Sequence, residues 1–63
     1  MGSKLKLVRE EARITQKELA DKSGVSRTII SGIESGRVKT TTTDTLIKIA
    51  NALEKKVSDI FFD

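Results

Sequence analysis

The chain has 63 residues, 37% of them hydrophobic and 33% charged, with 12 Lys and Arg against 9 Asp and Glu. A chain of this length folds as one domain around one small core, and this composition indicates a globular protein rather than a disordered one. It contains neither Cys nor His, which excludes disulfides and the usual zinc ligands, and its net charge of +3 is compatible with nucleic acid without pointing to it.

The spacing of apolar residues predicts a first helix near the start of the chain. Leu5, Val8 and Ala12 recur at helical intervals, so we expect an amphipathic helix over residues 4–12. Residues 1–3 are interpreted as an expression remnant or an N-terminal tail without a structural role. Residues 4–63 then form the single domain.

The second helix is predicted from the residues at its two ends. Thr15 precedes the segment QKELADKSG, and Glu18 follows three residues later, which is the pattern of a capping box. Gly24 is expected to end this helix in the left-handed conformation that glycine adopts without strain.

The third helix is predicted to begin after Ser26 and to end at Gly36, with Ile30 and Ile33 on its inward face. Its composition is unfavourable for a helix, because Gly32 alone costs about 1 kcal/mol relative to alanine in a helix interior. A small protein that keeps a weak helix in its middle needs a reason for it.

Two more helices complete the prediction. The β-branched run before Thr42 resists helix formation until that residue caps a fourth helix, whose apolar face is made by Leu46, Ile49, Ala50 and Leu53. A short fifth helix is expected around Val57, Ile60 and Phe61. No segment alternates with period two, so we expect an all-α fold without a sheet.

Residues 15–37 read TQKELADKSGVSRTIISGIESGR, two short helices joined by a tight turn. This segment resembles the helix-turn-helix of the lambda-repressor-like, Cro/C1-type regulators of the XRE family. The family pattern is matched at Thr15, Gln16, Leu19, Ala20, Gly24, Val25, Ser26, Ile30, Ser31, Ile33, Glu34 and Gly36. The resemblance extends to Arg9 and to the segment LIKIANAL, and it implies a five-helix lambda-repressor-like domain with the motif at helices 2 and 3.

The resemblance implies that the second helix of the motif, over residues 27–35, enters the major groove of double-stranded DNA. The residues expected to read bases are Arg27, Thr28, Ile29, Ser31 and Gly32. Arg27 can bond a guanine edge with two N–H groups, and Thr28 can bond an edge or touch a thymine methyl. Small outward residues would let the backbone approach the bases, which gives the weak helix its reason; the alternative is that Gly32 is merely tolerated.

Contacts to the DNA backbone are also implied by the resemblance. The expected phosphate contacts are Gln16, Lys17, Ser26, Arg37, Lys39, Thr40 and Thr41. The start of the first motif helix offers free N–H groups and the positive end of the helix dipole, and the segment RVKTTTT combines cations with hydroxyl donors. The alternative for that segment is a solvated connector.

Two further pairs of residues are singled out. In relatives the residues that match Arg9 and Glu34 form a partly buried ion pair, so we expect the same structural role here. Of the adjacent Phe61 and Phe62, one is expected to complete the core, and the other is either a capping hydrophobe or part of a dimer contact. A homodimer would place two recognition helices about 34 Å apart, one turn of DNA.

The function expected is that of a sequence-specific transcriptional regulator, a repressor or autoregulator, bound as a homodimer to an inverted-repeat operator. An enzyme is rejected because the carboxylates lie beside lysines as on solvated helix faces, with no phosphate loop or metal constellation, and no cofactor or small-molecule ligand is expected. The alternative is an antitoxin or controller-type protein that binds a partner protein.

No apolar run approaches the roughly 20 residues that span a bilayer and no secretory signal is present, so a cytoplasmic location is expected.

Overall fold

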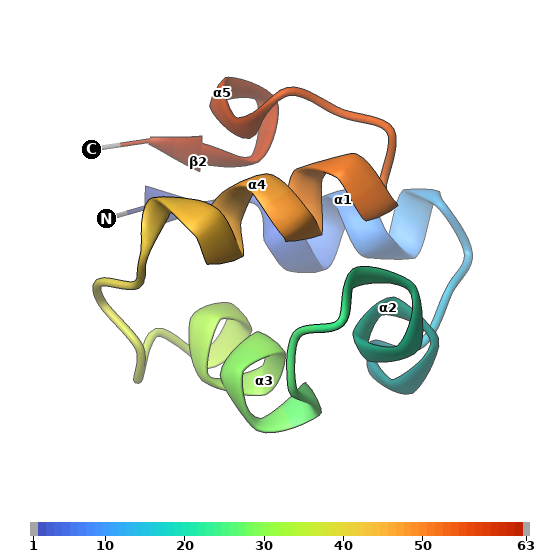
Figure 1. The fold of residues 1–63 in the computed structure, drawn as a ribbon, viewed down its shortest axis with the longest axis horizontal. Helices are drawn as coiled ribbons and strands as arrows, with labels where there is room; N and C mark the ends of the chain where they lie inside the picture. Colours follow the sequence, from blue (N-terminus) through green and yellow to red (C-terminus); the bar gives the residue numbers. More distant parts are fainter. Residues whose placement is uncertain (1, 63) are drawn as a thin grey trace.

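Five short helices succeed one another in the computed structural model, which describes residues 2–62 (Figure 1). They are α1 (Leu5–Glu11), α2 (Gln16–Ser23), α3 (Arg27–Ser35), α4 (Thr43–Ala52) and α5 (Val57–Ile60). The all-α, five-helix fold predicted from the sequence is confirmed. In the described residues no helix is both long and apolar enough to cross a bilayer.

The helix ends fall where the cap residues predicted them. The hydroxyls of Thr15, Ser26 and Thr42 each accept a hydrogen bond from the backbone N–H three residues on, at 3.0, 3.2 and 3.2 Å. The reciprocal bond of the capping box is present at Thr15. Gly24 and Gly36 end α2 and α3 with φ of 73° and 85°, values that favour glycine.

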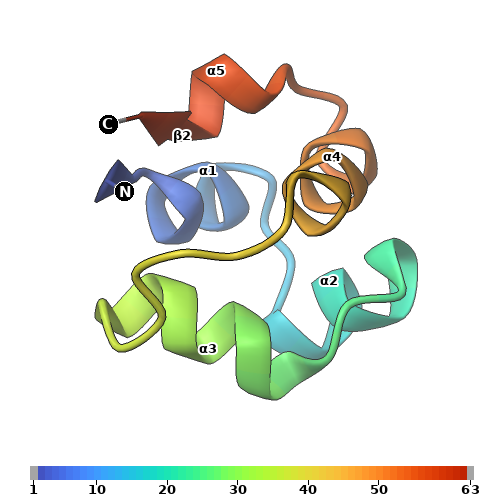
Figure 2. The ribbon, with the colours of Figure 1, turned by 60° about the vertical axis from the view of Figure 1, so that its left-hand side comes forward.

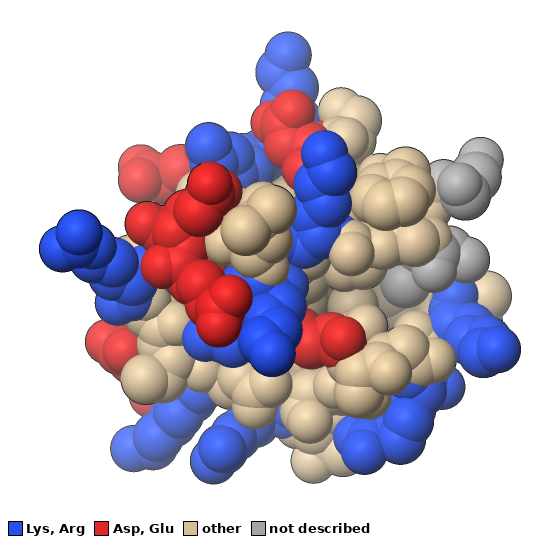
Figure 3. Space-filling view, turned by 180° about the vertical axis from the view of Figure 1, so that it is seen from behind, with Lys and Arg blue, Asp and Glu red and all other residues tan. Residues whose placement is uncertain are grey.

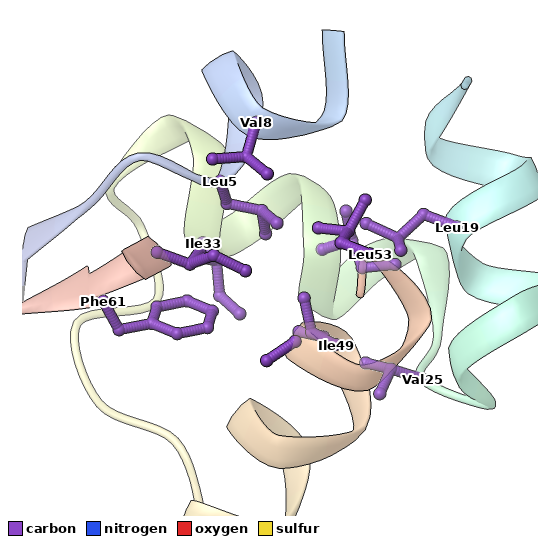
Figure 4. Packing of buried hydrophobic residues seen from close by; sticks show 11 residues of the cluster. Leu5, Val8, Leu19, Val25, Ile33, Ile49, Leu53 and Phe61 are labelled. Atoms are coloured by element: carbon purple, nitrogen blue, oxygen red, sulfur yellow. The ribbon is translucent and has the colours of Figure 1, made fainter. Parts of the chain in front are cut away.

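Each of the five helices contributes one fully buried side chain to the core. These side chains are Leu5, Leu19, Ile30, Ile49 and Ile60, all with 0% exposure. The side chains of the surrounding cluster point into the same interior (Figure 4). Because the helices are short, each depends on this shared core rather than on its own propensity.

The two ends of the chain pair as a minimal sheet, which the sequence analysis did not expect. Strand β1 (Gly2–Ser3) runs antiparallel to β2 (Phe61–Phe62), with Gly2 opposite Phe62 and Ser3 opposite Phe61. The prediction that residues 1–3 have no structural role is therefore wrong for Gly2 and Ser3, while Met1 lies outside the described residues. The prediction of no sheet is also wrong. The sequence pattern could not reveal this sheet, because a ladder of two residues is too short to show alternation.

Phe61 was expected within the fifth helix, and this too is wrong, because its backbone is extended (φ −117°, ψ 141°). The extended conformation turns the Phe61 ring into the core, where the residue is 6% exposed (Figure 4). Phe62 points to the other side and is 49% exposed. Phe61 is thus the aromatic residue that completes the core.

Candidate nucleic-acid interface

The helices α2 and α3 form a compact motif at one side of the molecule, away from α5 and the paired chain ends (Figures 1 and 2). Leu19 of α2, Val25 of the turn and Ile30 and Ile33 of α3 are buried against one another and the rest of the core. These residues fix the angle between the two helices, so their role is structural.

The first turn of α3 is open to solvent. Arg27 and Thr28 are exposed, Ser31 is half-buried on the same side, and Ser35 is exposed one turn further on. Ile29 is half-buried and packs against the core cluster, so it offers only part of its side chain. The face that α3 presents is therefore polar and led by one cation at its N-terminal end.

Gly32 does not lie on this open face, contrary to the expectation from the sequence. It is buried, because the segment after α3 turns back along the helix and covers it (Figure 2). The backbone N–H of Val38 donates to the Gly32 carbonyl at 2.9 Å, and a Cβ added at Gly32 would lie 2.5 Å from Val38 Cγ2. Glycine is present here because Val38 occupies the space, and not to let DNA approach.

This contact predicts that the effect of Gly32→Ala on the free energy of unfolding changes sign when Val38 is truncated. In the wild-type background we expect a net loss in the free energy of unfolding, because overpacking costs about 1–3 kcal/mol while alanine gains only about 1 kcal/mol of helix propensity. In a Val38→Ala background the two methyl groups are gone, and Gly32→Ala should stabilise the domain. Urea unfolding of the four proteins measures both effects; equal stabilisation in both backgrounds would mean that Val38 does not restrict residue 32.

An ion pair joins α1 to α3, as expected for Arg9 and Glu34. Arg9 Nε lies 2.7 Å from Glu34 Oε2, and Arg9 Nη2 donates to Glu34 Oε1 at 3.1 Å. Arg9 Nη1 also donates to the Ile14 carbonyl at 2.8 Å. The two side chains are only 12% and 5% exposed, so this is a largely buried, two-pronged pair.

The same carboxylate holds Gln16, the first residue of α2. The Gln16 amide donates from Nε2 to Glu34 Oε1 at 3.1 Å. Burial alone would raise the pKa of Glu34, but the hydrogen bonds from Arg9 and Gln16, together with the charges of Arg9 and Lys6, hold that pKa below its ordinary value. Gln16, predicted as a phosphate contact, is therefore fixed at the start of α2 by the ion pair.

The other residues predicted to contact phosphate lie on the surface around α3. Of this set, Lys17, Ser26, Arg37, Lys39 and Thr40 are exposed, and Thr41 is half-buried. The hydroxyl of Ser26 already accepts the bond that caps α3. Lys and Arg side chains project from the lower edge of the molecule in Figure 3, the edge at which α2 and α3 lie in Figure 1.

Two cations beside the motif were missed by the sequence analysis. Arg13, in the loop between α1 and α2, lines one hollow together with Lys17 and Arg27. Lys6 of α1 lines a second hollow with Ser31 and Ser35 of α3. The spacing of residues along one helix could not reveal either cation, because both approach the motif from outside it.

Comparison with known sequences agrees with this geometry. A family model described as helix-turn-helix matches residues 5–60, which is most of the chain. No curated protein sequence matches the chain.

Proposed function

The chain belongs to the Cro/C1-type helix-turn-helix family of DNA-binding regulators, and from this membership we propose that it represses transcription, including that of its own promoter, by binding an inverted-repeat operator as a homodimer. The recognition element is the first half of α3, placed in the major groove. Arg27 and Thr28 read base edges, with Ser31 and the exposed part of Ile29 beside them.

One observation carries the proposal: α3 presents an open, polar first turn with a cation, while its opposite side is anchored in the core. The side chains of Arg27 and Thr28 are exposed, and Ile30 behind them is fully buried. A rigid helix with free polar side chains at its N-terminal end fits the geometry by which helix-turn-helix proteins reach base edges.

Lys17, near the first turn of α3, and Arg37 and Lys39, after its last turn, are exposed cations. We assign them to backbone phosphates together with Gln16, Ser26, Thr40 and Thr41. Phosphate contacts fix the position of the protein on the duplex but carry little sequence information. Sequence discrimination therefore depends on few side chains, because Gly32 offers none and is covered by Val38. We expect a short half-site with strong preference at only a few base pairs.

The homodimer is assigned to the surface beside the paired chain ends, where Phe62 is 49% exposed. In Figure 1 the paired chain ends lie at the left flank of the domain, at a level between α5 and α3.

The test is selection of binding sites from a random duplex library by the purified protein near physiological salt. Enrichment of an inverted repeat, with half-site centres about one helical turn apart, is the expected result. Weak, salt-sensitive binding to any duplex without enrichment would contradict sequence-specific regulation. The motif would then be a scaffold for a partner protein.

The side-chain assignment has its own prediction. Arg27→Ala is expected to weaken binding to the selected operator by about 1–3 kcal/mol and to relax the preference at one base pair of each half-site. Lys55→Ala removes another exposed cation, in the segment between α4 and α5, and should change neither. Titration of both variants on the operator and on single-base variants measures the effect. Uniform weakening on all sequences would assign Arg27 to phosphate instead.

A further inference from the structure

The loop after α1 contains a non-glycine residue in a conformation that favours glycine. Arg13 has φ of 60°, in the left-handed region. Its backbone N–H donates to the Glu10 carbonyl at 3.0 Å, and the next N–H, of Ile14, donates to the Arg9 carbonyl at 3.4 Å. This pair of bonds is the Schellman motif that ends a helix, and the residue at the position of Arg13 is usually glycine because a Cβ there is strained.

The side chain of Arg13 lies among other cations at the start of α2. Arg13, Lys17 and Arg27 line one hollow, beside Thr15 and Gln16 at the helix N-terminus. Within residues 2–62 none of these three cations takes part in an ion pair. Glu10 is the acidic residue that lines the hollow. Three cations gathered from a loop and two helices favour an anion in the space between them.

We propose that Arg13 binds a phosphate of the DNA backbone, together with Lys17, in this hollow. The inference rests on the proposed function, since the duplex supplies the phosphate when α3 lies in the groove. Arg27, which also lines this hollow, belongs to α3 and is assigned to the bases. An arginine at position 13 provides a charged fork for the phosphate oxygens, which glycine cannot provide, and this explains why a strained residue ends α1.

The variant Arg13→Gly separates this role from a purely structural one, because the two effects have opposite signs. Removing the side chain relieves the backbone, so Tm should rise by roughly 4–8 °C. Affinity for duplex DNA should nevertheless fall about tenfold near physiological salt. The slope of log K against log salt concentration should become less steep by about 0.9, the contribution of one phosphate contact on double-stranded DNA.

The chain offers a matched control in Glu54, which ends α4 in the same way. Its φ is 56°, its N–H donates to Asn51, and the following N–H donates to Ala50. Glu54→Gly should raise Tm to a similar extent without loss of DNA affinity, because it relieves the same strain without removing a cation. Arg13→Lys should keep the salt slope of the wild type.

The outcomes distinguish this inference from the proposed function. If Arg13→Gly raises Tm and leaves both affinity and salt slope unchanged while the wild type binds DNA, the role of Arg13 at the phosphate is overturned and the proposed function stands. If the wild type binds no duplex at all, the proposed function fails first, and the assignment of Arg13 fails with it.

Discussion

Glu34→Ala is expected to leave the protein marginally stable at neutral pH and room temperature. The variant leaves the Arg9 guanidinium, only 12% exposed in the wild type, without its carboxylate, and it releases Gln16 from its acceptor. Removing one partner of a buried pair costs about 3–5 kcal/mol. A domain of this size has a total stability of roughly 3–9 kcal/mol, so the loss is comparable to the whole. Urea unfolding followed by circular dichroism measures it.

The surface pair Asp44 and Lys48 is the matched control. Their charged atoms are 3.1 Å apart, but the side chains are 75% and 52% exposed, so Asp44→Ala should cost less than about 1 kcal/mol. A second control replaces both buried partners, as in Arg9→Met with Glu34→Leu. This double variant leaves no unpaired charge and should be more stable than Glu34→Ala. A Glu34→Ala variant no less stable than Asp44→Ala would show that the buried pair does not hold α1 to α3.

The ion pair also makes stability depend on pH in a defined direction. Burial raises the pKa of Glu34, but the hydrogen bonds from Arg9 and Gln16 and the charges of Arg9 and Lys6 together lower it below its ordinary value in the folded protein. The unfolded chain therefore takes up a proton at higher pH than the folded one. The stabilisation is complete above the ordinary glutamate pKa of about 4.3 and is lost as pH falls through the folded value. Glu34→Gln should flatten this acid limb of the stability curve.

The sequence predicted features that a few neighbouring residues determine. The caps at Thr15, Ser26 and Thr42 each depend on a side chain that bonds a backbone N–H three residues away, so a local pattern suffices. The glycines at positions 24 and 36 end helices for an equally local reason. The ion pair between α1 and α3 was predictable only through the family resemblance, because 25 residues separate its partners.

The errors came from contacts made by other segments. A helical wheel places Gly32 on the outer side of α3, but it carries no information that Val38 returns to cover that side. Likewise, the end of α1 contains no glycine, so the left-handed conformation of Arg13 left no signal in the pattern. The loop that follows α3 thus partly determines which face of the helix stays open to solvent.

The low helix propensity of α3 leads to the second large effect, at Ile30. Because α3 contains glycine and serine in its interior, its own propensity cannot hold it, and burial of Ile30 and Ile33 must do so. Ile30 has 0% exposure, and Ile30→Ala should cost about 2–5 kcal/mol through lost burial and the cavity left behind. We expect urea unfolding to show a domain that is marginally stable or unfolded, and operator binding to be lost with the fold.

The adjacent Ile29 provides a control for this prediction, because the two isoleucines lie in the same helix but differ in burial. Ile29 is half-buried, so Ile29→Ala should cost clearly less stability than Ile30→Ala. If Ile29 touches a thymine methyl, its truncation should weaken operator binding while the domain stays folded. Ile30→Val, which removes one methylene, should cost about 0.5–1.5 kcal/mol and leave binding intact. Similar stability losses at positions 29 and 30 would contradict the burial of Ile30 as the anchor of α3.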